Sequence, residues 1–233
     1  MTPPSLSRPA LRAVLFDAGN TLVFLDYTRI AAGVATELEL ALRGEELAAC
    51  AGEAARAMER AGSDQERTAA YFEALFLQAG IPSERLAEVR GCLTRLHRER
   101  HLWCSVPAST RSALARLKAA GLLLGVVSNS EGRVEEALEA AGLRDHFDVV
   151  IDSGLIGIEK PDPRIFQAAL EALAVSPEEA IYVGDLYEID VVGARAAGIE
   201  AVLVTTTSIH DLAESLLAGD ESTRMIPSNT EPK

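Results

Sequence analysis

Residues 12–24, RAVLFDAGNTLVF, join a strong strand signal to an abrupt turn. The run 13–16 is apolar throughout, which predicts a strand buried on both faces, because half-buried strands alternate apolar with polar residues. The run ends at Asp17, and Gly19 and Asn20 follow as turn residues. An Asp at a strand end is often an ordinary turn residue. A carboxylate there also suits a site that binds a cation or attacks an electrophile.

The composition indicates a globular, acidic protein. The chain has 233 residues, of which 48% are hydrophobic, and its formal net charge is −13. This length holds either one domain with an insertion or two modest domains. Binding to a nucleic-acid backbone needs a basic footprint, so the charge argues against a nucleic-acid partner. No apolar run approaches the ~20 residues that cross a bilayer, which predicts no membrane partner.

The termini and the cysteines favour a cytoplasmic protein. Prolines and serines occupy the first ten residues, where a secretory signal has an apolar core, so we expect a flexible arm over residues 1–11. The polar, proline-bearing residues 219–233 predict a flexible tail. Cys50, Cys92 and Cys104 lack the spacing of a disulfide framework or a zinc site, which predicts reduced thiols. The sequence leaves the oligomeric state open.

Residues 25–105 have a helical pattern. Ala, Leu, Glu and Arg recur at helical spacing, with interruptions near Gly44, Gly62 and Gly80. Apolar residues at i, i+3 and i+4 give each segment one apolar face. Three interruptions predict four helices, and a helical bundle inserted after the first strand is the simplest packing.

From residue 106 onward, strand and helix patterns alternate, which predicts a parallel sheet with helices on both faces. The expected strands cover residues 122–127, 147–151, 180–183 and 201–204, and the expected helices cover residues 109–120, 132–141, 163–174, 191–197 and 209–217. With residues 12–24, residues 106–218 therefore form a doubly wound α/β core. Neither GxGxxG nor GxxxxGK[ST] occurs, so dinucleotide and P-loop sites lose their main support.

Polar side chains follow four of the expected strands. Asp17 follows the first, Ser128 and Asn129 the second, Lys160 lies in the loop beyond the third, and Asp185 follows the fourth. Each alone has an ordinary structural use, such as capping a helix. Because the carboxyl ends of parallel strands share one edge of the sheet, we expect these residues to face one crevice.

Four motifs make the chain resemble a known family. They are DAGNT at residues 17–21, VVSN at residues 126–129, GIEKPDPRIF around Lys160, and YVGDLYEIDVVGA at residues 182–194. In this order and spacing the chain resembles a haloacid dehalogenase-like (HAD) superfamily hydrolase over nearly its whole length except the tails. The resemblance implies a Rossmann-like core and, at residues 25–105, an all-helical cap of the C1 type.

The resemblance also implies roles for the converging residues. Asp17 would be the nucleophile that forms an aspartyl-phosphate, Ser128 and Asn129 would hold the phosphoryl oxygens, and Lys160 would offset their charge. Phosphoryl transfer depends mainly on positioning and charge neutralisation, which agrees with these roles. The implied substrate is a small phosphorylated metabolite.

Mg²⁺ is the cofactor that the resemblance implies. Its ligands would be Asp185, one oxygen of Asp17 and the backbone carbonyl of Gly19. Asp190 would bind the metal through water or orient Lys160. Mg²⁺ prefers a few carboxylates together with waters and phosphate oxygens, as this set provides.

One position departs from the family pattern. Phosphatases of this family usually have a second Asp two residues after the nucleophile, as acid and base, and this chain has Gly19. Positioned acid–base help is worth about 10²- to 10⁴-fold, so we expect its absence to slow alkyl phosphate esters most. Asp26, Tyr27 and Glu188 are the nearest candidates to replace it.

Two alternatives to the phosphatase stay open. A phosphate-binding or regulatory protein would keep the pocket but turn over poorly. A 2-haloacid dehalogenase also lacks the second Asp, but such enzymes need no metal and lack the motif that Gly184 and Asp185 provide. Phosphonate-cleaving relatives need a cap lysine, and residues 22–105 contain none.

Overall fold

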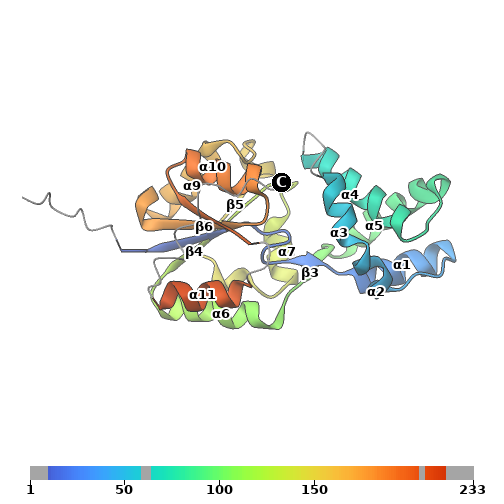
Figure 1. Ribbon diagram of the computed structural model, residues 1–233, viewed down its shortest axis with the longest axis horizontal. Coiled ribbons are helices and arrows are strands. Elements are labelled where there is room, and N and C mark those ends of the chain that lie inside the picture. The colour runs from blue at the N-terminus through green and yellow to red at the C-terminus, as the bar shows by residue number, and fades with distance from the viewer. Residues whose placement is uncertain (1–9, 59–63, 205–207, 219–233) are drawn as a thin grey trace, which may run out of the picture. The chain divides into compact units, whose positions relative to one another are not determined.

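The computed structural model describes residues 10–58, 64–204 and 208–218. The expected tail and nearly all of the expected arm lie outside these ranges. The chain divides into two compact units (Figure 1). We call Met1–Phe24 with Ser105–Lys233 the core unit, and Leu25–Cys104 the helical unit. None of the described helices is long and apolar enough to cross a membrane.

A five-stranded parallel sheet forms the centre of the core unit. Its order is β5-β4-β1-β6-β7, with the strands β1 (Ala13–Phe16), β4 (Leu123–Ser128), β5 (Val149–Asp152), β6 (Ala180–Gly184) and β7 (Glu200–Leu203). Ala13 pairs with Leu123 on one side and with Ala180 on the other, so β1 lies in the middle. All four residues of β1 are fully buried, as its continuous apolar pattern predicts.

Helices cover both faces of this sheet. The core unit contains α6 (Ala108–Ala119), α7 (Val134–Ala140), α8 (Ser153–Ile156), α9 (Pro163–Leu173), α10 (Val192–Ala196) and α11 (Ile209–Leu217). Figure 1 shows α9 and α10 on one face and α6 and α11 on the other. The α/β class and the doubly wound sheet are therefore confirmed, and the expected strands and helices of this unit shift by two residues or fewer.

The helical unit contains one more helix than its sequence pattern predicts. Its described helices are α1 (Tyr27–Leu38), α2 (Gly44–Ala49), α3 (Ala51–Met58), α4 (Asp64–Gln78) and α5 (Leu86–Glu99). The expected second helix is divided at Cys50, because the N–H of Cys50 bonds to the carbonyl of Leu47, one residue nearer than an α-helical partner. The expectation of four helices was wrong in this respect.

Two short strands at the ends of the helical segment were not predicted. β2 (Phe24–Leu25) pairs with β3 (Trp103–Ser105), and the N–H of Asp26 donates to the carbonyl of Leu102 at 3.0 Å. The two ends of the insertion therefore lie side by side. Strands of two or three residues carry too little alternation to be recognised in a sequence.

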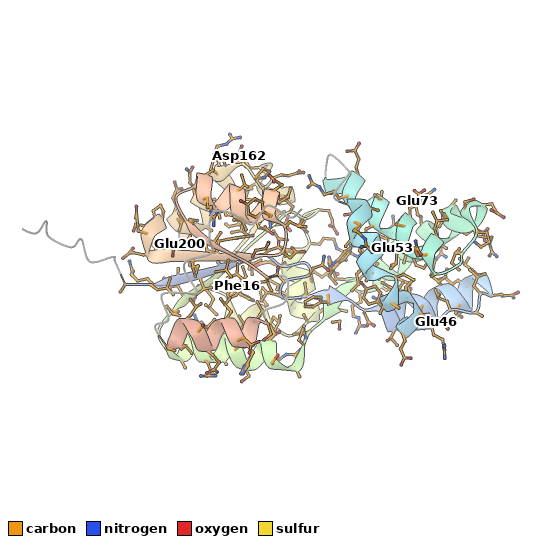
Figure 2. All side chains as sticks on the ribbon, in the orientation of Figure 1. Phe16, Glu46, Glu53, Glu73, Asp162 and Glu200 are labelled. Carbon is orange, nitrogen blue, oxygen red and sulfur yellow. The ribbon has the colours of Figure 1, made fainter. Side chains whose placement is uncertain are left out.

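Apolar side chains lie in the interior of each unit, and many acidic side chains lie on the surface. Phe16 is fully buried in the core unit, whereas Glu46, Glu53 and Glu73 are exposed on the helical unit (Figure 2). The helical unit has an apolar core of its own, to which the buried side chains of Val34, Leu47, Leu75 and Val89 contribute. Each unit thus buries its own apolar faces.

Candidate active site

Strand β1 delivers Asp17 to the carboxyl edge of the sheet. The N–H of Asp17 donates to the carbonyl of Val183 at 2.8 Å, so the residue continues the pairing of β1 with β6. The chain then turns at Asn20, which adopts a left-handed backbone with φ of 56°. Asn tolerates this region better than most residues. Asp17 is 7% exposed, so its carboxylate is largely removed from water.

Lys160 is the buried cation beside this carboxylate. Its Nζ donates to Asp17 Oδ1 at 2.6 Å, to Asp190 Oδ1 at 2.8 Å and to the Tyr182 hydroxyl at 3.0 Å. The side chain lies in the loop that precedes α9 and is 4% exposed. Burial alone would lower the pKa of Lys160, but the carboxylates of Asp17 and Asp190 raise the pKa above its usual value. The ammonium therefore stays charged in this site.

Asp190 reaches the site because the chain forms a π-helical turn over Tyr187–Val191. Its Oδ2 accepts a hydrogen bond from the N–H of Leu186 at 2.9 Å. A Cβ on Gly184 would lie 2.4 Å from Asp190 Cγ, so only glycine fits at the end of β6. This glycine allows the second acid of the motif to approach the sheet edge.

The three carboxylates form a candidate metal site. One oxygen from each of Asp17, Asp185 and Asp190 lies within 4.8 Å of the others. Burial and the neighbouring carboxylates raise the pKa of Asp185 to about 8, and burial raises the pKa of Asp17 to about 6 despite Lys160. The single positive charge of Lys160 thus does not balance the negative charges of three ionised carboxylates. A hard divalent cation bound by carboxylate oxygens, such as Mg²⁺, fits this donor set.

Metal-free protein is expected to lose stability as the pH rises toward 8. The pKa of Asp185 is 3.8 in the unfolded chain and about 8 in the folded protein. Between these two pH values the folded state holds a proton that the unfolded state has lost. The free energy of unfolding then falls as pH rises through this window. Urea unfolding in EDTA at pH 5, 6, 7 and 8 measures the slope. The slope should be smaller in Asp185→Asn; equal slopes would contradict the prediction.

Ser128 and Asn129 end β4 and begin the loop that follows. Ser128 is 5% exposed. The side-chain amide of Asn129 binds the backbone of Lys160 in both directions: its Nδ2 donates to the Lys160 carbonyl at 3.1 Å, and its Oδ1 accepts from the Lys160 N–H at 2.8 Å. The amide therefore fastens the lysine loop to β4. A phosphate contact from Asn129 would come from its backbone N–H.

Asp152 and Ser153 support the same loop and were not predicted from the sequence. The carboxylate of Asp152, at the end of β5, accepts from the N–H groups of Gly132 and Val134 at 3.0 and 2.9 Å. The hydroxyl of Ser153 accepts from the N–H of Ser130 at 3.0 Å. A sequence signal existed, because Asp152 closes an apolar run as Asp17 does.

Two of the three candidate replacements for the missing acid have structural partners. Asp26 caps α1 by accepting from the N–H of Arg29 at 3.0 Å, and the hydroxyls of Tyr27 and Tyr71 lie 2.6 Å apart. Both belong to the helical unit. Glu188 is exposed on the π-helical turn of the core unit. The structure describes structural contacts for Asp26 and Tyr27 and an exposed position for Glu188, and an acid–base role for any of the three stays a prediction.

The comparison with protein families decides the relationship that the motifs suggest. A model of the haloacid dehalogenase-like hydrolases matches residues 11–198. The chain belongs to this family. The matched region of this HAD hydrolase includes four of the five strands of the sheet (β1, β4, β5 and β6) and all three site carboxylates, so the expected family and its Rossmann-like fold are confirmed.

Relatives of this HAD hydrolase include named phosphatases. It is 31% identical over 211 residues to glyceraldehyde 3-phosphate phosphatase from Methanopyrus kandleri, which covers 87% of each chain. It is 42% identical over 145 residues to phosphoserine phosphatase from Thermus thermophilus, covering 62% of this chain and 55% of that protein. The chain spans about half the length, or less, of several curated relatives it matches.

A solved dehalogenase has the same fold. The L-2-haloacid dehalogenase from Xanthobacter autotrophicus, with chloropropionic acid covalently bound, superposes with a TM-score of 0.53 at 27% identity. The match covers 90% of this chain and 84% of that one. The fold alone therefore does not distinguish a phosphatase from a dehalogenase, and the distinction has to come from the side chains of the site.

Proposed function

We propose that this HAD hydrolase is a Mg²⁺-dependent phosphatase that acts on a small phosphorylated metabolite through an aspartyl-phosphate on Asp17. The observation that carries the proposal is the set of three neighbouring acidic side chains, Asp17, Asp185 and Asp190, of which Asp17 and Asp190 form ion pairs with the ammonium of Lys160. The names of the glyceraldehyde 3-phosphate and phosphoserine phosphatases support the phosphatase class. We also propose a cytoplasmic location, which the three free thiols support.

The residues of the site divide the work of phosphoryl transfer. A carboxylate oxygen of Asp17 forms the bond to phosphorus while the bond to the leaving oxygen breaks. The ammonium of Lys160 offsets negative charge on the transferred group, and the hydroxyl of Ser128 and the backbone N–H of Asn129 donate to its oxygens. Water then hydrolyses the aspartyl-phosphate and restores Asp17. Orientation and charge neutralisation carry most of this chemistry.

The metal would be held by this chain's own oxygens. Asp185, one oxygen of Asp17, the backbone carbonyl of Gly19 and Asp190, directly or through water, are the proposed ligands. Mg²⁺ at this place would neutralise phosphate charge and align the transferred group with Asp17. Burial, together with the neighbouring carboxylates, raises the pKa values of Asp185 and Asp17, and a divalent cation bound there would favour their ionised forms.

We assign residues 25–105 to the cap, as the segment that would select the substrate and exclude water. Its boundaries follow the helical pattern of the sequence and the ends of the insertion at Asp26 and Leu102. The partner is therefore a small phosphorylated molecule, and the net charge of −13 argues against nucleic acid.

One assay tests the class of chemistry. We expect release of nitrophenol from nitrophenyl phosphate in the presence of Mg²⁺, and loss of that release in EDTA. Tight binding of inorganic phosphate without release would instead support a phosphate-binding or regulatory protein. Halide release from a 2-haloacid without metal would support the dehalogenase and overturn the phosphatase.

Gly19→Asp is expected to raise the turnover of an alkyl phosphate by about 10²-fold, because it supplies the acid that protonates the leaving oxygen. Nitrophenyl phosphate should gain much less, since nitrophenolate leaves without a proton. Gly19→Asn is the matched control, with a side chain of the same size that transfers no proton. Equal effects of Asp and Asn on the ratio of the two substrates would contradict this explanation.

A further inference from the structure

Tyr182 lies inside the site, although its sequence context is that of a core strand. It is the third residue of β6, and its side chain is fully buried. The hydroxyl oxygen accepts from Lys160 Nζ at 3.0 Å. The hydroxyl also lies 3.1 Å from the carbonyl of Val127 and 3.0 Å from Asp190 Oδ1, either of which can accept its hydrogen bond. One hydroxyl thus joins β6, β4 and the lysine.

The donors of the ammonium are fully accounted for by this arrangement. A lysine ammonium has three N–H donors and no acceptor. Lys160 directs them to Asp17, Asp190 and the Tyr182 hydroxyl. The two carboxylates attract the charge, while the neutral hydroxyl fixes the third direction. Without it, the ammonium could rotate about Cε–Nζ and shift toward either acid.

We propose that Tyr182 is a positioning residue for Lys160. Its hydroxyl holds the ammonium between Asp17 and Asp190 and ties it to the carbonyl of Val127, the residue before Ser128. The lysine and the hydroxyl of Ser128 are thereby kept at a fixed spacing for a phosphoryl group. This role rests on the proposed phosphatase function, but the geometry of the ammonium can be measured without it.

A purely structural role for Tyr182 makes a different prediction. Its ring packs edge-on against Phe166, with centroids 4.9 Å apart and an interplanar angle of 81°. Phenylalanine would keep this packing. A tyrosine needed only for the core would thus be replaced at little functional loss. A buried hydroxyl must also be hydrogen-bonded. The partners of the Tyr182 hydroxyl are Lys160, Asp190 and the backbone carbonyl of Val127.

The first test is Tyr182→Phe, assayed with nitrophenyl phosphate and saturating Mg²⁺. We expect kcat to fall about 10- to 100-fold, because a small misplacement of a catalytic cation is costly, while KM changes by less than about 3-fold. Phe166→Leu is the matched control: it disturbs the same ring packing but leaves the hydroxyl in place. It should lower the urea midpoint and keep kcat. A kcat within about twofold of wild type in Tyr182→Phe would overturn the proposal.

The second test observes the ammonium directly. The chain has three lysines, Lys118, Lys160 and Lys233, so a sample labelled with ¹⁵N-lysine gives few side-chain signals. We expect Lys160 to show a slowly exchanging ammonium signal, which Tyr182→Phe loses or exchanges at least about 10-fold faster. Lys118→Arg identifies the Lys118 signal.

These two readouts separate the possible failures. If wild-type protein releases no nitrophenol but shows the protected ammonium and its loss in Tyr182→Phe, the phosphatase proposal fails and the positioning of Lys160 stands. If the protected ammonium is missing in the folded wild-type protein, or is unchanged in Tyr182→Phe, the positioning proposal is overturned. A missing signal in the wild-type spectrum overturns the positioning proposal even where the variant does not fold.

Discussion

Asp17→Asn is expected to lower kcat for nitrophenyl phosphate by at least ~10⁴-fold, the scale seen when an enzyme's nucleophile is removed. Asn has the same shape as Asp, but its amide is not a competent nucleophile toward phosphorus. Lys160 keeps Asp190 and Tyr182 as acceptors, and the amide oxygen of the introduced asparagine can still accept its third N–H. The loss should therefore fall on chemistry, with inorganic phosphate still bound.

The same substitution should leave the fold intact. Burial raises the pKa of Asp17 to about 6, which shows that the ionised carboxylate is costly in this site. A neutral amide removes its repulsion toward Asp185 and Asp190. We expect the urea midpoint of Asp17→Asn at pH 8 to equal or exceed that of wild type.

Asp145→Asn is the matched control for this experiment, because Asp145 is exposed on the 3₁₀ turn Arg144–His146. It should leave kcat unchanged. Residual kcat above a tenth of wild type in Asp17→Asn would show that Asp17 is not the nucleophile. Unfolding of the variant by circular dichroism would show instead that the carboxylate is required for the fold.

Lys160→Met is expected to lower the free energy of unfolding by about 3–5 kcal/mol, since it leaves buried carboxylates without their counter-charge. Asp17 and Asp190 lose the ammonium that lies 2.6 and 2.8 Å from them. Methionine fills a similar volume, so packing changes little. The loss should be smaller at pH 5 than at pH 8, because the acids can then take up protons.

The surface pair of Lys118 and Asp148 supplies the control. Its Nζ lies 2.7 Å from Asp148 Oδ1, but both side chains are about one-third exposed. Ion pairs in such surroundings contribute about 0–1 kcal/mol, so Lys118→Met should cost little. Urea unfolding of both variants in EDTA makes the comparison. Equal losses for Lys160→Met and Lys118→Met would show that the buried charges are not what Lys160 stabilises.

The convergence of Asp17, Lys160 and Asp185 could be predicted because it depends on backbone rules. Apolar runs identify the strands, parallel strands end at one edge, and the loops that follow the strands must then begin at that edge. These rules require no knowledge of side-chain direction. They place the polar residues that follow four strands near one edge of the sheet, but they do not predict which side-chain atoms form hydrogen bonds with one another.

The hydrogen-bond partners of individual side chains could not be predicted from the sequence pattern. The amide of Asn129 binds the backbone of Lys160, and this depends on the path of a loop more than thirty residues away. Tyr182 falls within the expected strand 180–183, and a burial pattern gives no sign of the partners of its hydroxyl. Asp190 reaches the site through a π-helical turn, for which the sequence has no periodic signal.

The central place of β1 has a consequence for how the chain is assembled on the ribosome. Ala13 pairs with Leu123 and Ala180, so the earliest strand to leave the exit tunnel waits for partners made after the whole helical unit. The helical unit is a continuous segment whose described elements are mostly helices, and helical bundles fold quickly. An apolar strand that waits unpaired is exposed to aggregation. Slow synthesis beyond residue 104 should therefore reduce the yield of native protein, and early chaperone binding should restore it.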